Sequence, residues 1–336
     1  MINNLVFVAS IQLTMLLLVS LSTFAIYWMM VFMSVGYSLT LRKHLTRLIT
    51  KYCEKLKFYG LRGKVNDLLY SYLSNRKQYV SLNGFDSEVK DVTCGVPQGS
   101  SLGPLLFLLY INDLRLCLSK SDTGHFADDT FILYSSKIPK TIETVINTEM
   151  KQVVKWLRLN KLSLNAGKTE LIIFHSRKRN FEEEKISIKL NNEKLRSVNH
   201  VKYLGMYIDE TLSWDHHINE LCKKLSRANG IISKLRHNAP LETRLQVYYA
   251  LFYSHLIYGC NVWGLSTLKN IDRIIKLEKK CVRIMTFAPF NSPTNQIFIE
   301  LKLLKVEDII KVHQLKLVFD FHIKSLPINL MSLFRT

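Results

Sequence analysis

Residues 124–134, GHFADDTFILY, decide how the rest of this chain is interpreted. Apolar, β-prone segments flank Asp128 and Asp129, so the pattern predicts a hairpin that carries both carboxylates at its tip. Two adjacent charges on buried strands need a compensating cation. Mg²⁺ suits such oxygen ligands, because it keeps several waters and takes one or two carboxylates plus substrate phosphates. A solvated turn is the alternative, since an isolated pair of aspartates is more often a surface loop.

A Gly- and Pro-rich loop, GVPQGSSLGP at residues 95–104, leads into the apolar stretch LLFLLYI at residues 105–111. This pattern predicts a tight loop that feeds a buried helix with Pro104 in its first turn. Glycines let the backbone approach a ligand closely, and the free N–H groups at a helix start can face a phosphate or a base. An ordinary strand-to-helix connection is the alternative.

Taken together, residues 94–130 resemble the reverse transcriptases of non-LTR (LINE-like) retrotransposons, whose fingerprint includes GVPQGSxLGPLLFLxYINDL followed by FADDT. The resemblance implies an α+β fold: a partial right-hand polymerase palm, which is an antiparallel sheet with helices, followed by a helical thumb. It also implies an RNA-directed DNA polymerase, a nucleotidyltransferase that binds an RNA template, a DNA primer and a dNTP.

The chemistry that this resemblance implies is two-metal nucleotidyl transfer, in which two Mg²⁺ ions activate the primer hydroxyl and stabilise the leaving pyrophosphate. By resemblance, Asp128 is the principal catalytic metal ligand and Asp129 the supporting one. Lys168 matches a lysine near the outgoing pyrophosphate, although a single lysine in a turn is usually a solvated charge. The other implied site residues are the nucleotide and template contacts Gly95, Pro97, Gln98, Gly99 and Ser100, and the primer-holding hairpin residues Tyr203, Leu204 and Gly205.

The third carboxylate of the family has no counterpart here. In the family it precedes a YGIRG break, in a segment like DLSKAFD, whereas this chain has VGYSLT at residues 35–40 upstream of YGLRG at residues 59–63. We expect the fingers that precede that segment in the family to be absent as well. Losing one metal ligand leaves the other carboxylates repelling each other and removes transition-state stabilisation. We therefore expect a truncated, catalytically defective copy, unless Asp67, Asp86 or Asp91 replaces the missing ligand.

The composition limits the possible functions. The chain has 336 residues, 48% of them hydrophobic, which is enough to bury a core and to form two structural units. Its 46 Lys and Arg against 27 Asp and Glu give a formal net charge of +19, which predicts a polyanionic partner, nucleic acid or an anionic membrane surface. A non-catalytic nucleic-acid-binding protein is therefore an alternative to a polymerase. The six cysteines lack zinc-ligand spacing and are expected to be free thiols.

The amino-terminal segment is apolar. No charged residue occurs before Arg42, and three hydroxyl residues are the main interruptions of residues 15–33, a length that can cross a bilayer core of roughly 30 Å. The pattern predicts an apolar N-terminal helix, a membrane anchor within residues 5–35, with the body of the protein in the cytosol. The alternative is unrelated sequence joined to a transposon fragment, which leaves the protein in the cytoplasm or nucleus. The expected segments are this one at residues 1–41, an incomplete palm at 42–210, and a helical thumb with a C-terminal extension at 211–336.

Periodicity predicts the main elements of the body. Apolar residues at helical spacing predict helices on both sides of residues 59–63 and another at 141–159. Asn83-Gly84 predicts a hairpin turn. The helix that follows Trp214 carries a basic face, expected to lie along a nucleic-acid backbone or else to be merely solvated. Its residues are Lys223, Lys224, Arg227, Lys234 and Arg236.

Overall fold

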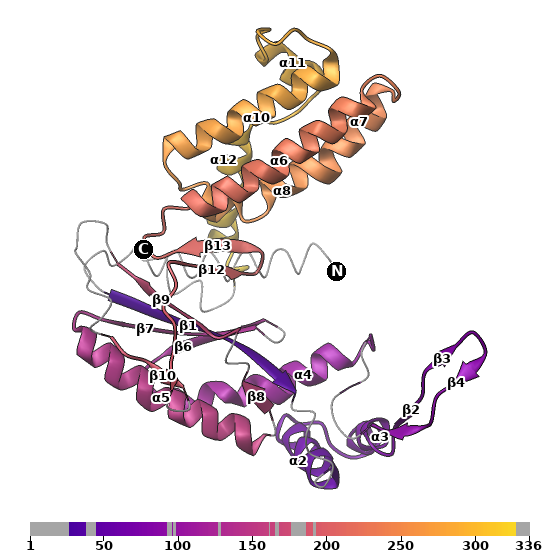
Figure 1. Cartoon of the computed structure of the whole chain (residues 1–336), viewed down its shortest axis with the longest axis vertical. Coiled ribbons are helices and arrows are strands. Elements are labelled where there is room, and N and C mark those ends of the chain that lie inside the picture. Colours follow the sequence, from indigo (N-terminus) through magenta and orange to yellow (C-terminus); the bar gives the residue numbers. More distant parts are fainter. Residues whose placement is uncertain are drawn as a thin grey trace. The chain divides into compact units, whose positions relative to one another are not determined.

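The computed structural model divides the chain into two compact units, each described here by itself. The sheet unit lies within Tyr27–Ile173 and Phe181–Val198, and the helical unit includes Asn199–Thr336. Figure 1 labels the helices and strands of both. The described residues are 27–37, 45–92, 96, 99–126, 129–160, 162–164, 168–175, 186–190 and 193–326.

An antiparallel sheet forms the centre of the sheet unit. It consists of β1 (Tyr27–Tyr37), β6 (Asp122–Phe126), β7 (Asp129–Ser136), β8 (Leu162–Leu164) and β9 (Glu170–Phe174). The strand order is β6-β7-β1-β8, and β9 also pairs with β1. The ladder between β1 and β7 runs from Tyr27 opposite Ser136 to Ser34 opposite Asp129. β1 is therefore the central strand (Figure 1).

The expected apolar N-terminal helix is wrong for residues 27–37, which form β1. A strand in the interior of a sheet has a continuous apolar sequence. Hydrophobic periodicity alone cannot distinguish such a sequence from that of a buried helix. The backbone of this segment pairs with β7 instead, with Val31 opposite Ile132. No helix in the described part of the chain is long and apolar enough to cross a membrane. Residues 1–26 lie outside the described residues.

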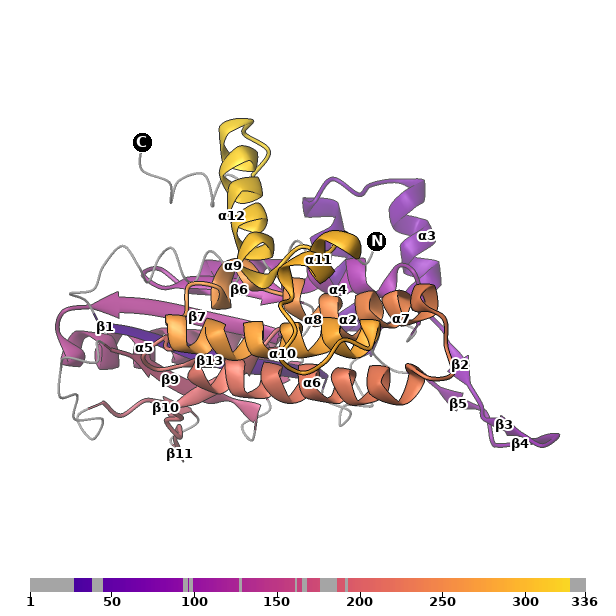
Figure 2. The same ribbon diagram turned by 90° about the horizontal axis from the view of Figure 1, so that it is seen from above.

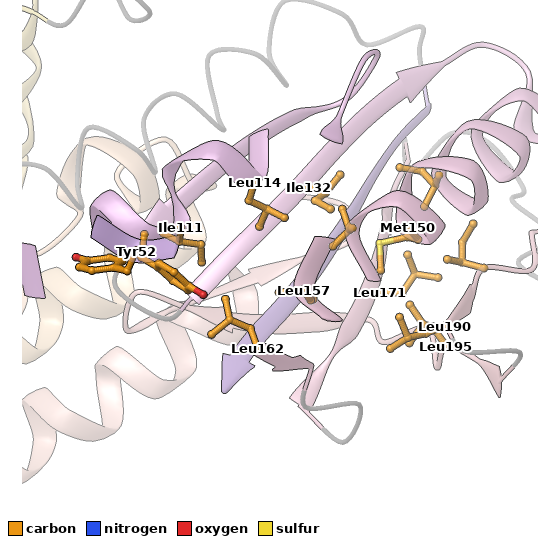
Figure 3. Close-up of a cluster of buried hydrophobic side chains, with 14 of the residues drawn as sticks. Tyr52, Ile111, Leu114, Ile132, Met150, Leu157, Leu162, Leu171, Leu190 and Leu195 are labelled. Atoms are coloured by element: carbon orange, nitrogen blue, oxygen red, sulfur yellow. The ribbon is translucent and has the colours of Figure 1, made fainter. Parts of the chain in front are cut away.

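Helices cover the sheet and complete its core. α5 (Pro139–Leu159) packs on β7, and Figure 3 shows its Met150 and Leu157 in one buried cluster with Leu171 of β9. α2 (Leu45–Phe58) and α3 (Lys64–Leu73) flank residues 59–63, as predicted. α4 (Gly103–Ile111) begins with a proline in its first turn, also as predicted, and continues as the 3-10 helix η1 (Asn112–Cys117).

Short strands extend from this unit. β2 (Lys77–Gln78) pairs with β5 (Lys90–Asp91), and β3 (Ser81–Leu82) pairs with β4 (Phe85–Asp86). Figures 1 and 2 show these four strands as one ribbon directed away from the central sheet. The predicted turn at Asn83-Gly84 joins β3 to β4, and both residues have positive φ, 51° and 83°. β10 (Lys189–Leu190) and β11 (Glu193–Lys194) form a second hairpin beside α5.

The helical unit begins with the hairpin of β12 (His200–Tyr203) and β13 (Met206–Asp209), which sequence analysis had assigned to the palm. Asp209 connects this hairpin to the first helix, because its carboxylate accepts hydrogen bonds from the amides of Thr211, Ser213 and Trp214. α6 and α10 lie side by side in both views (Figures 1 and 2). The helices are α6 (Asp215–Leu235), α7 (Leu241–Val247), the π-helical segment η4 (Tyr248–Tyr253), α8 (Ser254–Ile257), α9 (Cys260–Trp263), α10 (Leu268–Thr286), α11 (Asn295–Glu300) and α12 (Val306–His322).

Candidate functional site

The acidic tip is the turn between β6 and β7. These strands form the predicted antiparallel hairpin, with Phe126 opposite Asp129. Asp129 is exposed, whereas the next residue, Thr130, is 1% exposed, as the alternation of side chains along a strand requires. The Thr130 hydroxyl and His125 Nδ1 are hydrogen-bonded across the hairpin at 2.9 Å. Asp128 lies outside the described residues.

The sequence did not reveal that β1 would lie beside this tip. Its residue Ser34 stands directly opposite Asp129 in the ladder, and β1 contains no Asp or Glu. Sequence analysis had placed the segment that carries the missing carboxylate at residues 35–40. The signal for the strand was the run of aromatic, β-branched and Met residues, which suits a central strand as well as a membrane helix.

The loop before α4 is described in part. Gly99 has a φ of 80°, a left-handed conformation that glycine adopts at little cost. The Ser100 hydroxyl accepts a hydrogen bond of 3.1 Å from the amide of Gly103, the first residue of α4. This contact holds the end of the loop against the helix. Gly95, Pro97 and Gln98 lie outside the described residues.

Lys168 is exposed and lies two residues before β9, a strand that pairs with β1. It therefore belongs to the same sheet unit as Asp129. The acidic residues considered as replacements for the missing ligand lie elsewhere: Asp67 on α3, Asp86 on β4 and Asp91 on β5. The ribbon that contains β4 and β5 extends away from the sheet (Figures 1 and 2).

The three primer-hairpin residues lie in the helical unit at the turn between β12 and β13. Tyr203 is 2% exposed, so its side chain packs in the core. Leu204 and Gly205 both have positive φ, 47° and 79°, as a two-residue turn between twisted strands requires. The Tyr258 hydroxyl donates a hydrogen bond to the Leu204 carbonyl. The helical unit thus holds the turn in place and leaves Gly205 exposed.

One ionisable side chain of the hairpin, His125, has a shifted pKa. Burial, together with the nearby Arg115, lowers the pKa of His125, so its ring is neutral at neutral pH. Among the described residues, no group of three or more His, Cys, Asp or Glu side chains is placed to hold a metal ion. A two-metal site needs several carboxylate oxygens. The donors at the described part of the tip, with a serine opposite Asp129, do not fit that requirement.

The comparisons with a family model and with curated proteins both find similarity to RNA-directed DNA polymerases. Residues 49–208 match the family model described as reverse transcriptase (RNA-dependent DNA polymerase). The chain is 28% identical over 254 residues to the probable RNA-directed DNA polymerase from transposon X-element of Drosophila melanogaster, covering 73% of this chain and 27% of the relative. It is 26% identical over 249 residues to the RNA-directed DNA polymerase from mobile element jockey of the same species, covering 71% and 27%. The chain spans about a quarter of the length of these two relatives.

Proposed function

Residues 49–208 form a reverse transcriptase domain of the non-LTR retrotransposon type, and on that premise we propose that this chain keeps the nucleic-acid-binding frame of an RNA-directed DNA polymerase but has lost nucleotidyl transfer. The single observation that carries this proposal is the pairing of Ser34 with Asp129. Directly opposite residues of an antiparallel pair have Cβ atoms about 5 Å apart. A carboxylate at position 34 would therefore lie close enough to share a cation with Asp129, whereas a serine adds no charge.

The loss of this carboxylate weakens the site electrostatically. Asp128 and Asp129 are adjacent, and two like charges oppose each other's ionisation unless cations hold them. Mg²⁺, when bound, would supply charge stabilisation for the substrate phosphates, but a cation held by the adjacent pair has fewer anionic oxygens around it. In this proposal, Gly99 and Ser100 still line the path of the template, and Lys168 still faces the side from which pyrophosphate would leave.

Restoring the missing charge tests the proposal. The full-length chain and its Ser34→Asp variant are compared for Mg²⁺-dependent extension of a DNA primer on an RNA template. We expect no extension by the unmodified chain and measurable extension by Ser34→Asp. Ser34→Asn is the matched control, because it has the same size as the aspartate without the charge, and it should stay inactive. Adding Asp129→Asn to the Ser34→Asp chain should remove the gained activity.

Extension by the unmodified chain, lost in Asp128→Ala, would contradict the proposal, because it would require another carboxylate in the site. The Asp67→Asn, Asp86→Asn and Asp91→Asn variants would then identify which residue had replaced the missing ligand. Circular dichroism of each variant confirms that a loss of activity is not a loss of fold.

The nucleic-acid-binding part of the proposal rests on the charge of the helical unit. α6 buries Leu221, Leu225 and Ile232 and exposes Lys223, Lys224 and Arg227, so its basic face is accessible to a phosphate backbone. Binding of an RNA–DNA duplex should weaken steeply with salt, because each phosphate contact releases counterions. We expect this binding to survive Asp128→Ala and Asp129→Ala, which separates it from catalysis. Salt-independent binding would contradict this part.

A further inference from the structure

A groove of about 800 Å³ runs along α5 of the sheet unit. Its other wall is formed by residues 187–190, which contain β10 and are called the β10 segment below. Its charged lining residues are mainly cationic: Lys151, Lys155, Arg158 and Lys189. Glu143 is the acidic residue of the lining, and its carboxylate is 3.1 Å from the ammonium of Lys140. The groove therefore presents a net positive charge. It shares no residue with the acidic tip, and nothing in the proposed polymerase chemistry uses it.

The wall of the groove is held by the side chain of Asn147. Its amide donates to the carbonyl of Ser187 at 2.9 Å, and its carbonyl accepts from the amide of Lys189 at 2.8 Å. These two bonds attach the β10 segment to α5 and hold Lys189 opposite the cations of the helix. The floor is apolar, formed by Met150 and Val154. The shape of the groove is therefore built into the fold, because its wall is hydrogen-bonded and Met150 is 1% exposed.

The helix cations follow a regular spacing. Lys151, Lys155 and Arg158 are exposed and occupy positions i, i+4 and i+7, so they share one face of α5. Like charges at this spacing destabilise a helix slightly, and binding an anion removes that cost. With a rise of about 1.5 Å per residue, the row follows the helix axis for about 10 Å, which is long enough to contact successive phosphates of one strand. The partly exposed Val154 of the apolar floor then faces the sugars and bases.

From this arrangement we propose that the α5 groove binds the backbone of a single-stranded RNA, at a site separate from the acidic tip. The proposal deepens the proposed function, since the strand concerned is the template before it enters the polymerase site. The groove would keep that strand on the protein even though nucleotidyl transfer is lost. The net charge of +19 and the cationic walls favour a polyanion, and the single row of cations favours one strand.

The test measures binding of a fluorescent single-stranded RNA to the full-length chain across a range of salt concentrations. Lys151→Glu with Lys155→Glu reverses two groove charges. We expect affinity at low salt to fall on the order of tenfold, and the slope of log K against log salt to become shallower by about 1.4, since each lost phosphate contact removes about 0.7 for single strands. Lys151→Arg with Lys155→Arg should bind as the unmodified chain does.

The matched control is Lys64→Glu with Lys77→Glu, which makes the same charge change at exposed positions of the same unit outside the groove. An equal loss of affinity in this control would overturn the proposal, because net charge would then explain the effect. Unchanged binding by the groove variant would overturn it as well. Competition by polyglutamate as effective as by unlabelled RNA would assign the groove to an acidic protein instead. The readout does not depend on primer extension, so it separates failure of the groove from failure of the proposed function.

Discussion

Oε2 of Glu278, in α10, accepts a hydrogen bond of 3.1 Å from the backbone amide of Val306, the first residue of α12. Glu278 is 1% exposed. Burial raises the pKa of its carboxyl to about 8; the amide of Val306 opposes this shift, and Glu307 and Asp308 add to it. The contact that joins these two helices therefore involves a carboxyl that stays protonated at neutral pH.

Glu278→Gln should change how stability depends on pH. The folded chain holds a proton on Glu278 that the unfolded chain releases above its ordinary pKa of 4.5. The contribution of Glu278 to the free energy of unfolding should therefore fall as the pH rises from about 4.5 to about 8. Glutamine is neutral throughout and its carbonyl still accepts from Val306, so this decline should flatten. Urea titrations at pH 5, 6.5 and 8 measure it, and parallel declines in both proteins would contradict the assignment.

His217→Asn should change how the free energy of unfolding depends on pH below about 6.5. Nδ1 of His217 accepts from the amide of Tyr207 at 3.4 Å, and burial, helped by Lys224 and His216, lowers its pKa to about 4. Because the folded ring stays neutral while the unfolded ring gains a proton below pH 6.5, stability from this site should be lost as the pH falls from 6.5 to 4. Asparagine keeps an acceptor but does not titrate. The comparison is made in a protein that already carries Glu278→Gln. Urea titrations should show that adding His217→Asn removes the fall in the free energy of unfolding that His217 causes between pH 6.5 and 4.

Gly259→Ala and Gly230→Ala should change stability in opposite directions. Gly259 has a φ of 64°, and an added Cβ would clash with Sδ of Met206, so the substitution combines backbone strain with overpacking and should cost about 1–3 kcal/mol. Gly230 lies inside α6 with no atom within 4 Å of an added Cβ. Alanine there should stabilise by about 0.5–1 kcal/mol. Equal effects in thermal unfolding would contradict both.

Lys55→Met should loosen the contact of α2 with α4 and η1. The ammonium of Lys55 is 2.8 Å from the carboxylate of Asp113 and donates to the carbonyl of Tyr110 at 3.0 Å. It also lies 4.5 Å from the centre of the Tyr110 ring and 4.9 Å from that of Trp156. Because Asp113 is partly exposed and water can solvate it again, the expected cost is about 1.5 kcal/mol. Denaturant unfolding measures the cost. In a protein that already carries Asp113→Asn, Lys55→Met should cost less. An equal cost in both backgrounds would contradict the ion pair.

Short-range patterns predicted much of the sheet unit. The hairpin at Asp129, the turn at Asn83-Gly84 and the helices on both sides of residues 59–63 each depend on neighbours in the chain. The helix at residues 141–159 was confirmed for the same reason, because its apolar period shows which face is buried. The contacts of Asn147 with the β10 segment join residues about 40 positions apart, so no local sequence pattern predicts them.

By itself, the sequence determined the family motifs, the excess positive charge and the local elements, because each is written in consecutive or periodic residues. Only the tertiary structure decided that residues 27–37 are the central strand and that Ser34 stands opposite Asp129. An apolar run is equally compatible with a strand and with a helix. Which of the two it forms depends on partners about a hundred residues away. The register of β1 on β7, which links the fold to the proposed loss of catalysis, is a property of that pairing.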